Sequence, residues 1–161
     1  MNKIRFLLAS LLLLSGCSHY QKGQGAELAF STLYVAPVRN DSMAPQAQAL
    51  LSKQLMETLM GDGRVELTSK ESADATLEIT LSKYSRSISA TQEQDASLAQ
   101  SYTLTLEAHC DLIDNESGTP YFHKRSVSAT VNSLAPSEYQ GMPFLTNNLA
   151  KKIKDLVLNV W

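Results

Sequence analysis

The sequence lacks a pair of cysteines that could join two parts of a folded domain. Its two cysteines are Cys17, which follows a run of leucines, and Cys110, which lies in an alternating apolar segment. If Cys17 is used for another purpose, as argued below, Cys110 has no partner for an intramolecular disulfide. We therefore expect a fold that is stabilised by its core alone.

Signatures of catalysis and of metal binding are also missing from the sequence. None of the histidines, His19, His109 and His123, lies at metal-ligand spacing from another His or Cys. The chain contains no GxSxG, Walker A or GxGxxG motif. Glu93 and Asp95 lie in a polar segment, without the apolar surroundings that separate the pKa values of a catalytic carboxylate pair. We expect a protein that is not an enzyme and that has no cofactor or metal.

The chain has no excess of positive charge. Its formal net charge is −2, and its basic residues are scattered. Nucleic-acid-binding domains are usually basic, so we expect no nucleic-acid partner. Internal repeats and low-complexity segments are absent as well, and the length suits one domain with its own core.

The N-terminus has the three parts of a secretory signal. Lys3 and Arg5 give a positive start, Phe6 to Leu14 form an apolar middle, and Ser15 and Gly16 are small. The apolar run is shorter than the roughly 20 residues that a membrane-spanning helix needs. We expect residues 1–16 to be a signal peptide that is removed. The alternative is an ordinary secretory signal followed by an unrelated cysteine.

The residues Leu14-Ser15-Gly16-Cys17 resemble a bacterial lipobox. The resemblance implies that the thiol of Cys17 is lipidated and that acyl chains anchor the mature N-terminus, because each buried methylene contributes about 0.8 kcal/mol. By resemblance to lipoprotein sorting, Ser18 implies transfer to the outer membrane. We expect residues 17–28 to be the lipidated cysteine and a flexible tether, and residues 29–161 to form a single domain.

Two kinds of hydrophobic periodicity predict the fold. Strict alternation of apolar and polar residues over 75–83 and 102–113 predicts long strands, and apolar residues at steps of three and four predict helices over 45–60 and 143–160. Shorter strands are expected over 32–38, 64–68 and 121–131, with a turn at 39–42 and a polar hairpin tip over 89–100. The predicted class is α+β, a two-layer sandwich in which two helices cover one face of a mainly antiparallel four- to five-stranded sheet.

The opposite face of the predicted sheet is rich in hydroxyl groups. Alternation places Cys110 on the apolar face and collects the following residues on the other: Thr76, Thr80, Ser82, Thr103, Thr105, Ser126, Ser128 and Thr130. Such a face suits plain water, and it also suits a wet protein cavity such as the polar lumen of a β-barrel. The sequence leaves both possibilities open.

Four basic residues are candidates for ligand contact. Lys83 and Arg86 end one predicted strand, and Lys124 and Arg125 lie on another. If these strands pair, the four side chains could approach one another near the hairpin and meet phosphate groups through charge-assisted hydrogen bonds. The simpler interpretation is that all four are solvated.

Several segments in order resemble the LptE family of lipopolysaccharide-assembly lipoproteins: VAPVRN after the first strand, SADATLEITLSKYSR, and the YTLTLEAHCDLID hairpin that continues to SGTPYF. The resemblance implies two helices on a four-stranded sheet, location in the outer membrane, and a role in plugging and assembling the LptD β-barrel. It also implies binding of lipopolysaccharide, for which Lys83, Arg86, Lys124 and Arg125 are the candidate contacts. The segment 132–142 contains no Lys or Arg, which departs from the family and weakens the last expectation.

Two other functions remain as alternatives. One is an outer-membrane lipoprotein with a different partner, such as an activator of a peptidoglycan synthase. The tether of about ten residues reaches at most roughly 35 Å, which favours a partner within the membrane. The other alternative is a lipid-binding module that acts alone, which predicts an apolar pocket between the sheet and the helices.

Overall fold

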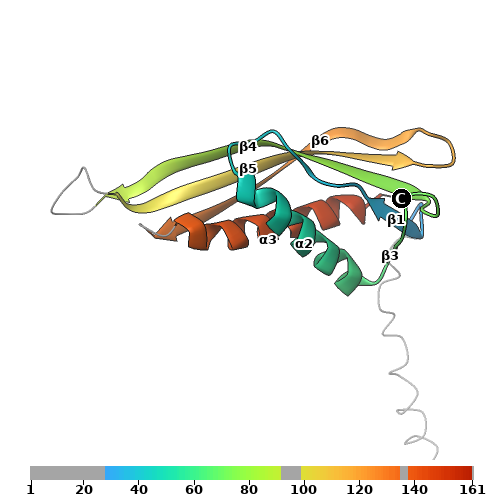
Figure 1. The fold of residues 1–161 in the computed structure, drawn as a ribbon, viewed down its shortest axis with the longest axis horizontal. Helices are drawn as coiled ribbons and strands as arrows, with labels where there is room; N and C mark the ends of the chain where they lie inside the picture. Colours follow the sequence, from blue (N-terminus) through green and yellow to red (C-terminus); the bar gives the residue numbers. More distant parts are fainter. Residues whose placement is uncertain (1–27, 92–98, 135–137, 161) are drawn as a thin grey trace, which may run out of the picture.

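The chain folds into two layers, a sheet and a pair of helices that cover one of its faces (Figure 1). This computed structural model describes residues 28–91, 99–134 and 138–160. The predicted α+β class and the two covering helices are confirmed. The proposed signal, Cys17 and most of the proposed tether lie outside the described residues.

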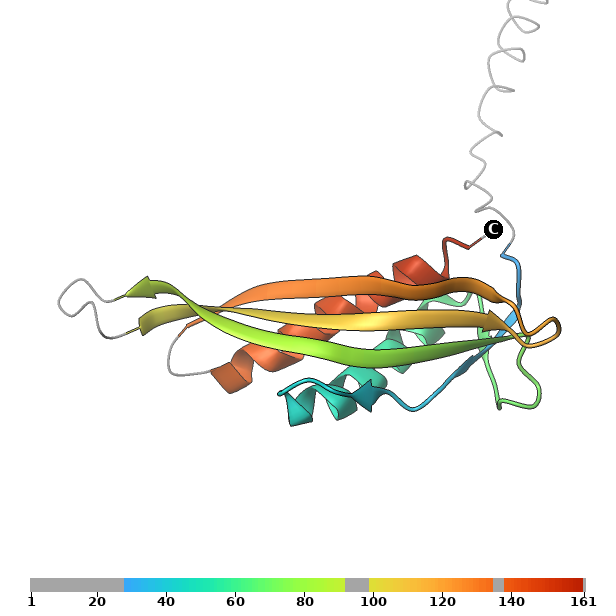
Figure 2. The same ribbon diagram turned by 90° about the horizontal axis from the view of Figure 1, so that it is seen from above.

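Within the described residues the sheet has six strands, in the order β3-β1-β4-β5-β6 with β2 also paired to β4. The bounds of the elements in chain order are β1 Thr32–Val35, β2 Arg39–Asn40, α2 Pro45–Asp62, β3 Glu66–Leu67, β4 Ala75–Thr91, β5 Ala99–Asp114, β6 Pro120–Leu134 and α3 Glu138–Val157. Strands β4, β5 and β6 are antiparallel neighbours (Figure 2), whereas β1 and β2 join β4 in parallel. The sheet is therefore mainly antiparallel, as predicted.

The central strands are longer than predicted. β4 has 17 residues and runs to Thr91, and β5 begins at Ala99, so both continue into the segment 89–100 that we expected to be a hairpin tip. At about 3.3 Å per residue β4 approaches a length of about 55 Å. Before this segment Ser85 and Ser87 lie opposite Thr105 and Thr103, and within it Ala90 lies opposite Ser101 and Thr91 opposite Ala99, with register shifts between these pairs. The rest of the predicted tip, 92–98, lies outside the described residues.

The predicted turn at 39–42 begins later than expected. Arg39 and Asn40 form β2, opposite Thr80 and Leu81 of β4. The side chain of Asn40 then makes the turn: its Oδ1 accepts from the N–H of Ser42 (3.0 Å), and its Nδ2 donates to the carbonyl of Ala44 (3.0 Å). An asparagine that bonds its own following backbone can end a strand and start a turn in one residue.

The two helices begin and end at recognisable residues. Pro45 opens α2, and Gly63 ends it in the left-handed conformation (φ 72°), as the Gly-Asp-Gly segment predicted. Helix α3 begins at Glu138, five residues before its predicted start at Pro143. Pro143 therefore lies inside α3, where it has no N–H to donate to the carbonyl of Tyr139 four residues earlier.

The core lies between the helices and the sheet. Its main contributors are fully buried apolar residues: Leu51, Leu55 and Leu59 of α2; Leu77, Ile79 and Leu81 of β4; Leu104, Leu106 and Leu112 of β5; and Leu145, Leu149 and Ile153 of α3. These are the positions that the two periodicities predicted. Met56, which also lies on α2, is exposed. The layer between the sheet and the helices is filled by these side chains.

One close approach fixes α3 against the sheet. Gly141 is buried near the start of α3, and a Cβ at this position would lie 2.8 Å from Leu104 Cδ1 and 2.9 Å from Ser133 Cβ. Only a residue without a side chain fits between α3 and the strands β5 and β6 at this distance.

A carboxylate ties β1 to β4 at the end of the sheet where the described chain begins, which we call the base. Asp74 Oδ2 accepts from the N–H of Ser31 (2.9 Å), the N–H of Thr32 (2.9 Å) and the hydroxyl of Ser31 (2.8 Å). These donors, the backbone N–H of Ser31 first among them, hold the pKa of Asp74 far below its usual range. The ionised form is therefore the one that clamps the two strands.

Candidate interaction surface

The sheet face opposite the helices carries rows of polar side chains that cross three strands. One row is Ser87, Thr103 and Asn132, and the next is Ser85, Thr105 and Thr130. Thr103 Oγ1 donates to Asn132 Oδ1 (2.9 Å), and the hydroxyls of Thr105 and Thr130 lie 3.2 Å apart. The hydroxyl-rich face expected from the sequence is confirmed, and we call it the hydroxyl face.

A β-bulge at Ser82 changes the facing of the outer half of β4. The register passes from Leu81 opposite Ala108 to Lys83 opposite Glu107, so Ser82 is an extra residue. Beyond it, Lys83 joins the hydroxyl face, and Arg86, opposite Leu104, turns to the helix side. There the Arg86 guanidinium lies 4.7 Å from the centre of the Tyr102 ring, a cation–π contact.

A second irregularity in the sheet, in β6, sets the directions of the Lys124 and Arg125 side chains. Asp111 of β5 contacts His123 Nδ1 and accepts from the N–H of Lys124 (2.9 Å). Lys124 adopts a positive φ of 47°, which is uncommon for a residue with a side chain. Arg125 then lies opposite Cys110 and faces the helix side. The carboxylate of Asp111 accordingly stabilises a bulge in β6.

The four basic candidates do not come together as one cluster. Lys83 lies on the hydroxyl face, whereas Arg86 and Arg125 face the helix side. Along β5, the partner of Lys83 is Glu107 and the partner of Lys124 is Asp111, four positions or about 13 Å away. The expected approach of the four near the hairpin is therefore wrong. Their contact with lipopolysaccharide stays a prediction for each residue separately.

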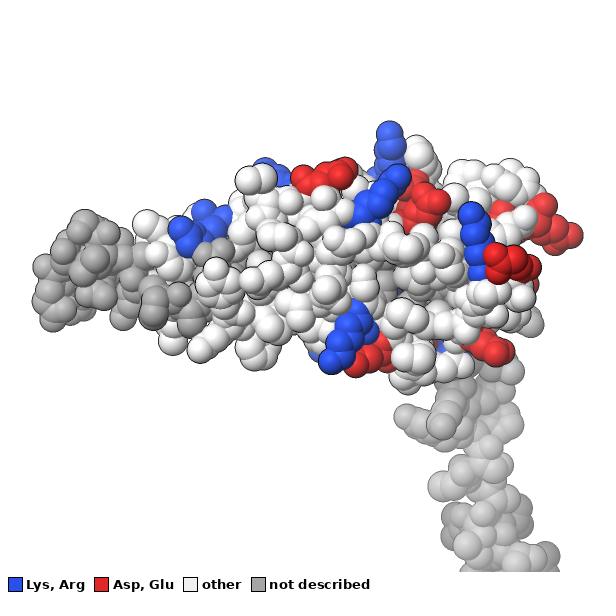
Figure 3. Space-filling view, in the orientation of Figure 1, with Lys and Arg blue, Asp and Glu red and all other residues white. Residues whose placement is uncertain are grey.

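Charged side chains are concentrated over part of the molecule. In Figure 3, Lys, Arg, Asp and Glu side chains alternate over the half toward the base, and uncharged atoms cover most of the visible surface toward the hairpin. Arg86 is the cation closest along β4 to the hairpin.

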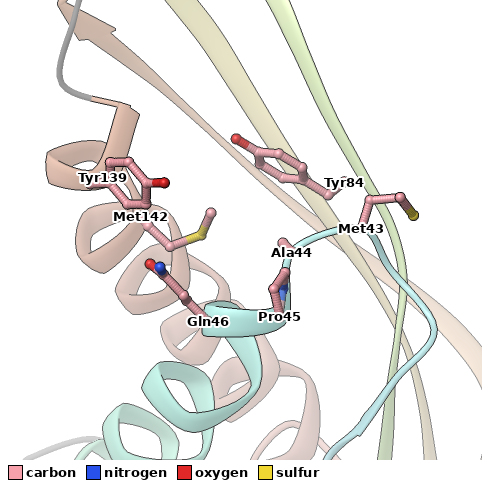
Figure 4. A pocket seen from close by; sticks show the side chains of 7 residues that line it. All are labelled: Met43, Ala44, Pro45, Gln46, Tyr84, Tyr139 and Met142. Carbon is pink, nitrogen blue, oxygen red and sulfur yellow. The ribbon is translucent and has the colours of Figure 1, made fainter.

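An apolar groove lies beside the starts of the two helices. It has a volume of about 190 Å³ and is lined by Met43, Ala44, Pro45, Gln46, Tyr84, Tyr139 and Met142 (Figure 4). Met43 is 87% exposed and Tyr139 is 75% exposed, so the groove opens to the surface. Its lining joins Tyr84 of β4 to residues of α2 and α3, so the groove lies at the open end of the layer between the sheet and the helices, where a lipid-binding module acting alone predicts a pocket.

The described residues contain little that could support catalysis. Burial, with a smaller contribution from Asp111, raises the pKa of Cys110 to about 12, so its thiol stays protonated. His109, the neighbour of Cys110 in β5, is exposed on the opposite face. Within 28–91, 99–134 and 138–160, no group of three His, Cys, Asp or Glu residues could hold a metal ion.

No helix in the described part of the chain is both long and apolar enough to cross a bilayer. The fold defines a class of protein: a small α+β domain in which two helices cover one face of a mainly antiparallel sheet and hydroxyl groups line the other. Comparison with known proteins gives the particular family. The lipopolysaccharide-assembly family LptE matches residues 30–154, and this chain belongs to that non-enzymatic family.

No curated protein sequence matches the chain significantly. Solved structures share its fold at low identity. The hypothetical protein CT253 from Chlamydia trachomatis is 12% identical with a TM-score of 0.61, over 82% of this chain and 98% of that one. A minor lipoprotein from Acinetobacter baumannii is 17% identical (TM-score 0.52; 81% and 94%). The PelC dodecamer from Paraburkholderia phytofirmans is 18% identical (TM-score 0.51; 84% and 92%).

The sequence reasoning missed the Ser82 bulge, although a signal for it exists. Before Ser82 the polar residues of β4 are even-numbered, as in Thr76, Glu78 and Thr80, and beyond it serines occupy positions 85, 87 and 89. This change of parity is the pattern that one extra residue produces in an alternating strand. It assigns Tyr84 and Arg86 to the helix side.

Proposed function

We propose that this chain is an outer-membrane lipoprotein that plugs and helps to assemble an LptD-type β-barrel for lipopolysaccharide transport. It is anchored through lipidated Cys17 after removal of residues 1–16, and residues 17–28 form the tether. Membership of the LptE family supports the role in lipopolysaccharide assembly. The domain occupies the barrel lumen from the periplasmic side.

The hydroxyl face is the observation that carries the proposal. A barrel lumen is polar, and rows of Ser, Thr and Asn offer donors and acceptors to it without the cost of burying charge. The length of β4, about 55 Å, exceeds the apolar band of about 25 Å on an outer-membrane barrel. A domain of this length reaches through the wall region while its base remains beside the tether.

Affinity purification of the tagged lipoprotein from outer membranes in mild detergent tests the plug role. The expected result is a large β-barrel in equal amount. The variant Thr105→Glu places a charge in the hydroxyl rows and should reduce barrel recovery at least fivefold. The matched control Glu116→Gln lies in an exposed base turn and should leave recovery unchanged. Recovery of a peptidoglycan synthase in place of a barrel contradicts the proposal and supports the alternative function.

Contact with lipopolysaccharide is a second part of the proposal, with Lys83, Arg86, Lys124 and Arg125 as the residues to test. Arg86 comes first because its guanidinium stacks on Tyr102 beside the exposed side chain of Ile88, which combines a cation with apolar surface. Arg86→Ala should weaken binding of purified lipopolysaccharide severalfold, and Lys53→Ala on the exposed face of α2 should not. Equal binding by both variants removes Arg86 from the proposed site.

A further inference from the structure

The long edge strand β6 has backbone groups that point away from the sheet. β6 is the last strand in the order, and no strand lies beyond it in the described part of the chain. Lys152 Nζ, on α3, donates to the carbonyl oxygen of Ser128 (2.7 Å). Backbone groups alternate between the two sides of a strand, so the residues two and four positions from Ser128 point outward as well.

The hydrogen bonds of β4 give the same alternation independently. The carbonyls of Leu77 and Leu81 accept from Ala36 and Asp41, on the side away from β5. Even-numbered residues of β4 between them, such as Thr80, therefore direct their backbone groups toward β5. When this alternation is followed through the β4–β5 and β5–β6 registers, odd-numbered residues of β6, such as Ala129, direct their backbone groups toward β5. The outward set is Ser126, Ser128, Thr130 and Asn132, and all four are exposed.

This edge lacks the devices that usually protect an open strand. From Ser126 to Asn132 the sequence SVSATVN contains no Lys, Arg, Asp, Glu or Pro. Edge strands normally carry such residues because unpaired N–H and C=O groups recruit other chains. Within the described residues, this stretch of the edge is protected by the side chain of Lys152, which reaches from α3 to the carbonyl oxygen of Ser128. A side chain on this flexible stem is easily displaced.

We propose that an extended segment of the barrel partner pairs with β6 and adds a strand to the sheet. This inference rests on the proposed function, and the hydroxyl face, which we assign to the lumen, is continuous with this edge through Thr130 and Asn132. The wall strands of a closed barrel are already paired to one another, so the segment comes from a loop or a terminus of the barrel chain.

Charge at one end of the edge defines the chemistry of this segment. Arg125, Lys152 and Asp155 line a groove of about 460 Å³ between β6 and α3, together with Tyr121, Phe122 and Leu156. Two cations face one acid there, whereas the edge from Ser126 to Asn132 is uncharged. The incoming segment is therefore neutral and strand-forming along most of its length, with an acidic residue beside Arg125 and Lys152.

Amide hydrogen exchange tests the pairing directly. Exchange is measured on the free lipoprotein and on the purified barrel complex, and the amides are read on the lipoprotein after quenching. In the free protein the amides of Thr130 and Asn132 should exchange fast, and those of Ala129 and Val131 slowly. In the complex, exchange of the Thr130 and Asn132 amides should slow at least tenfold. Fast exchange of Thr130 and Asn132 in an intact complex overturns the inference and leaves the proposed function standing.

A proline provides a second test. Thr130→Pro removes the outward N–H, which a solvent-facing edge position tolerates, and the control Thr130→Ala removes the hydroxyl but keeps the N–H. Both variants lose the hydroxyl of Thr130 and only the proline variant loses the N–H, so barrel recovery should be at least tenfold lower for the proline variant than for the alanine variant. Equal recovery overturns the inference, and if the proline variant does not fold, the exchange experiment decides. If the isolated lipoprotein forms a dimer in which the amides of Thr130 and Asn132 exchange slowly, a second copy of the chain occupies the edge, and this result also overturns the inference. Absence of any barrel with the wild type refutes the proposed function itself.

Discussion

The close approach of α3 to the sheet can be tested with a single added methyl group. In Gly141→Ala the new Cβ would lie 2.8 Å from Leu104 Cδ1, 2.9 Å from Ser133 Cβ and 3.0 Å from Ser133 Oγ. The leucine methyl can rotate away, but Ser133 Cβ is fixed to the backbone of β6. The helix must therefore move away from the sheet.

Two opposing effects set the magnitude. Overpacking of a tight core site costs about 1–3 kcal/mol. Alanine is favoured over glycine inside a helix by about 1 kcal/mol. We expect the free energy of unfolding to fall by up to about 2 kcal/mol, which corresponds to a Tm lower by up to about 6 °C.

Gly61→Ala is the matched control, because Gly61 is also helical and no atom lies within 4 Å of its added Cβ. It should gain up to about 1 kcal/mol from helix propensity alone. Urea denaturation followed by circular dichroism measures both variants. If Gly141→Ala is as stable as Gly61→Ala, α3 does not approach β5 and β6 as closely as described, and the reasoning is refuted.

Three further predictions follow from the ionisable groups. The lowered pKa of Asp74 stabilises the fold above the unfolded pKa of about 3.9, and this stabilisation is lost as the pH falls toward the folded pKa. The difference in Tm between wild type and Asp74→Asn should therefore be full at pH 7 and narrow below about pH 4. A difference that does not change with pH contradicts the role of the Asp74 carboxylate as a clamp. Because burial raises the pKa of Cys110 to about 12, its thiol should not react with a disulfide reagent at pH 8 until guanidinium unfolds the protein; rapid labelling of the native state would show an open core. Arg64 Nε donates to Asp62 Oδ1 (2.6 Å), and Lys154 Nζ lies 3.2 Å from Asp62 Oδ2, which lowers the pKa of Asp62 and links α2 to α3; Asp62→Asn should lower the Tm by a few degrees at low salt and by less in 1 M salt, and a salt-independent loss excludes the ionic origin.

The main layers could be predicted because long stretches of the helices and strands repeat one period. Leu51, Leu55 and Leu59 recur at helical spacing, and Leu104, Leu106 and Ala108 alternate, so burial followed directly from the pattern. Such patterns are reliable where one face of an element is buried over its whole length. The family resemblance was carried by the same segments and is confirmed over residues 30–154.

The arrangement of the basic side chains could not be predicted in the same way. The facings of Lys83 and Arg86 depend on one extra residue, Ser82, and those of Lys124 and Arg125 depend on a bulge held by Asp111. The change of parity around Ser82 is present in the sequence, whereas the bulge in β6 depends on a hydrogen bond from another strand, which the residues of β6 alone do not show. The two-residue strand β2 was missed for a related reason, since its pairing with β4 joins residues 41 positions apart.

The bulge at Ser82 divides β4 into two stretches that follow different numbering rules for mutational work. In a library aimed at the exposed face, the positions to vary are Glu78 and Thr80 before Ser82, but Lys83, Ser85 and Ser87 after it. A library that keeps to even numbers throughout would instead randomise Tyr84, which packs against the core. Loss of Ser82 itself should be tolerated, because it removes the extra residue and leaves every other side chain of the strand on its present face.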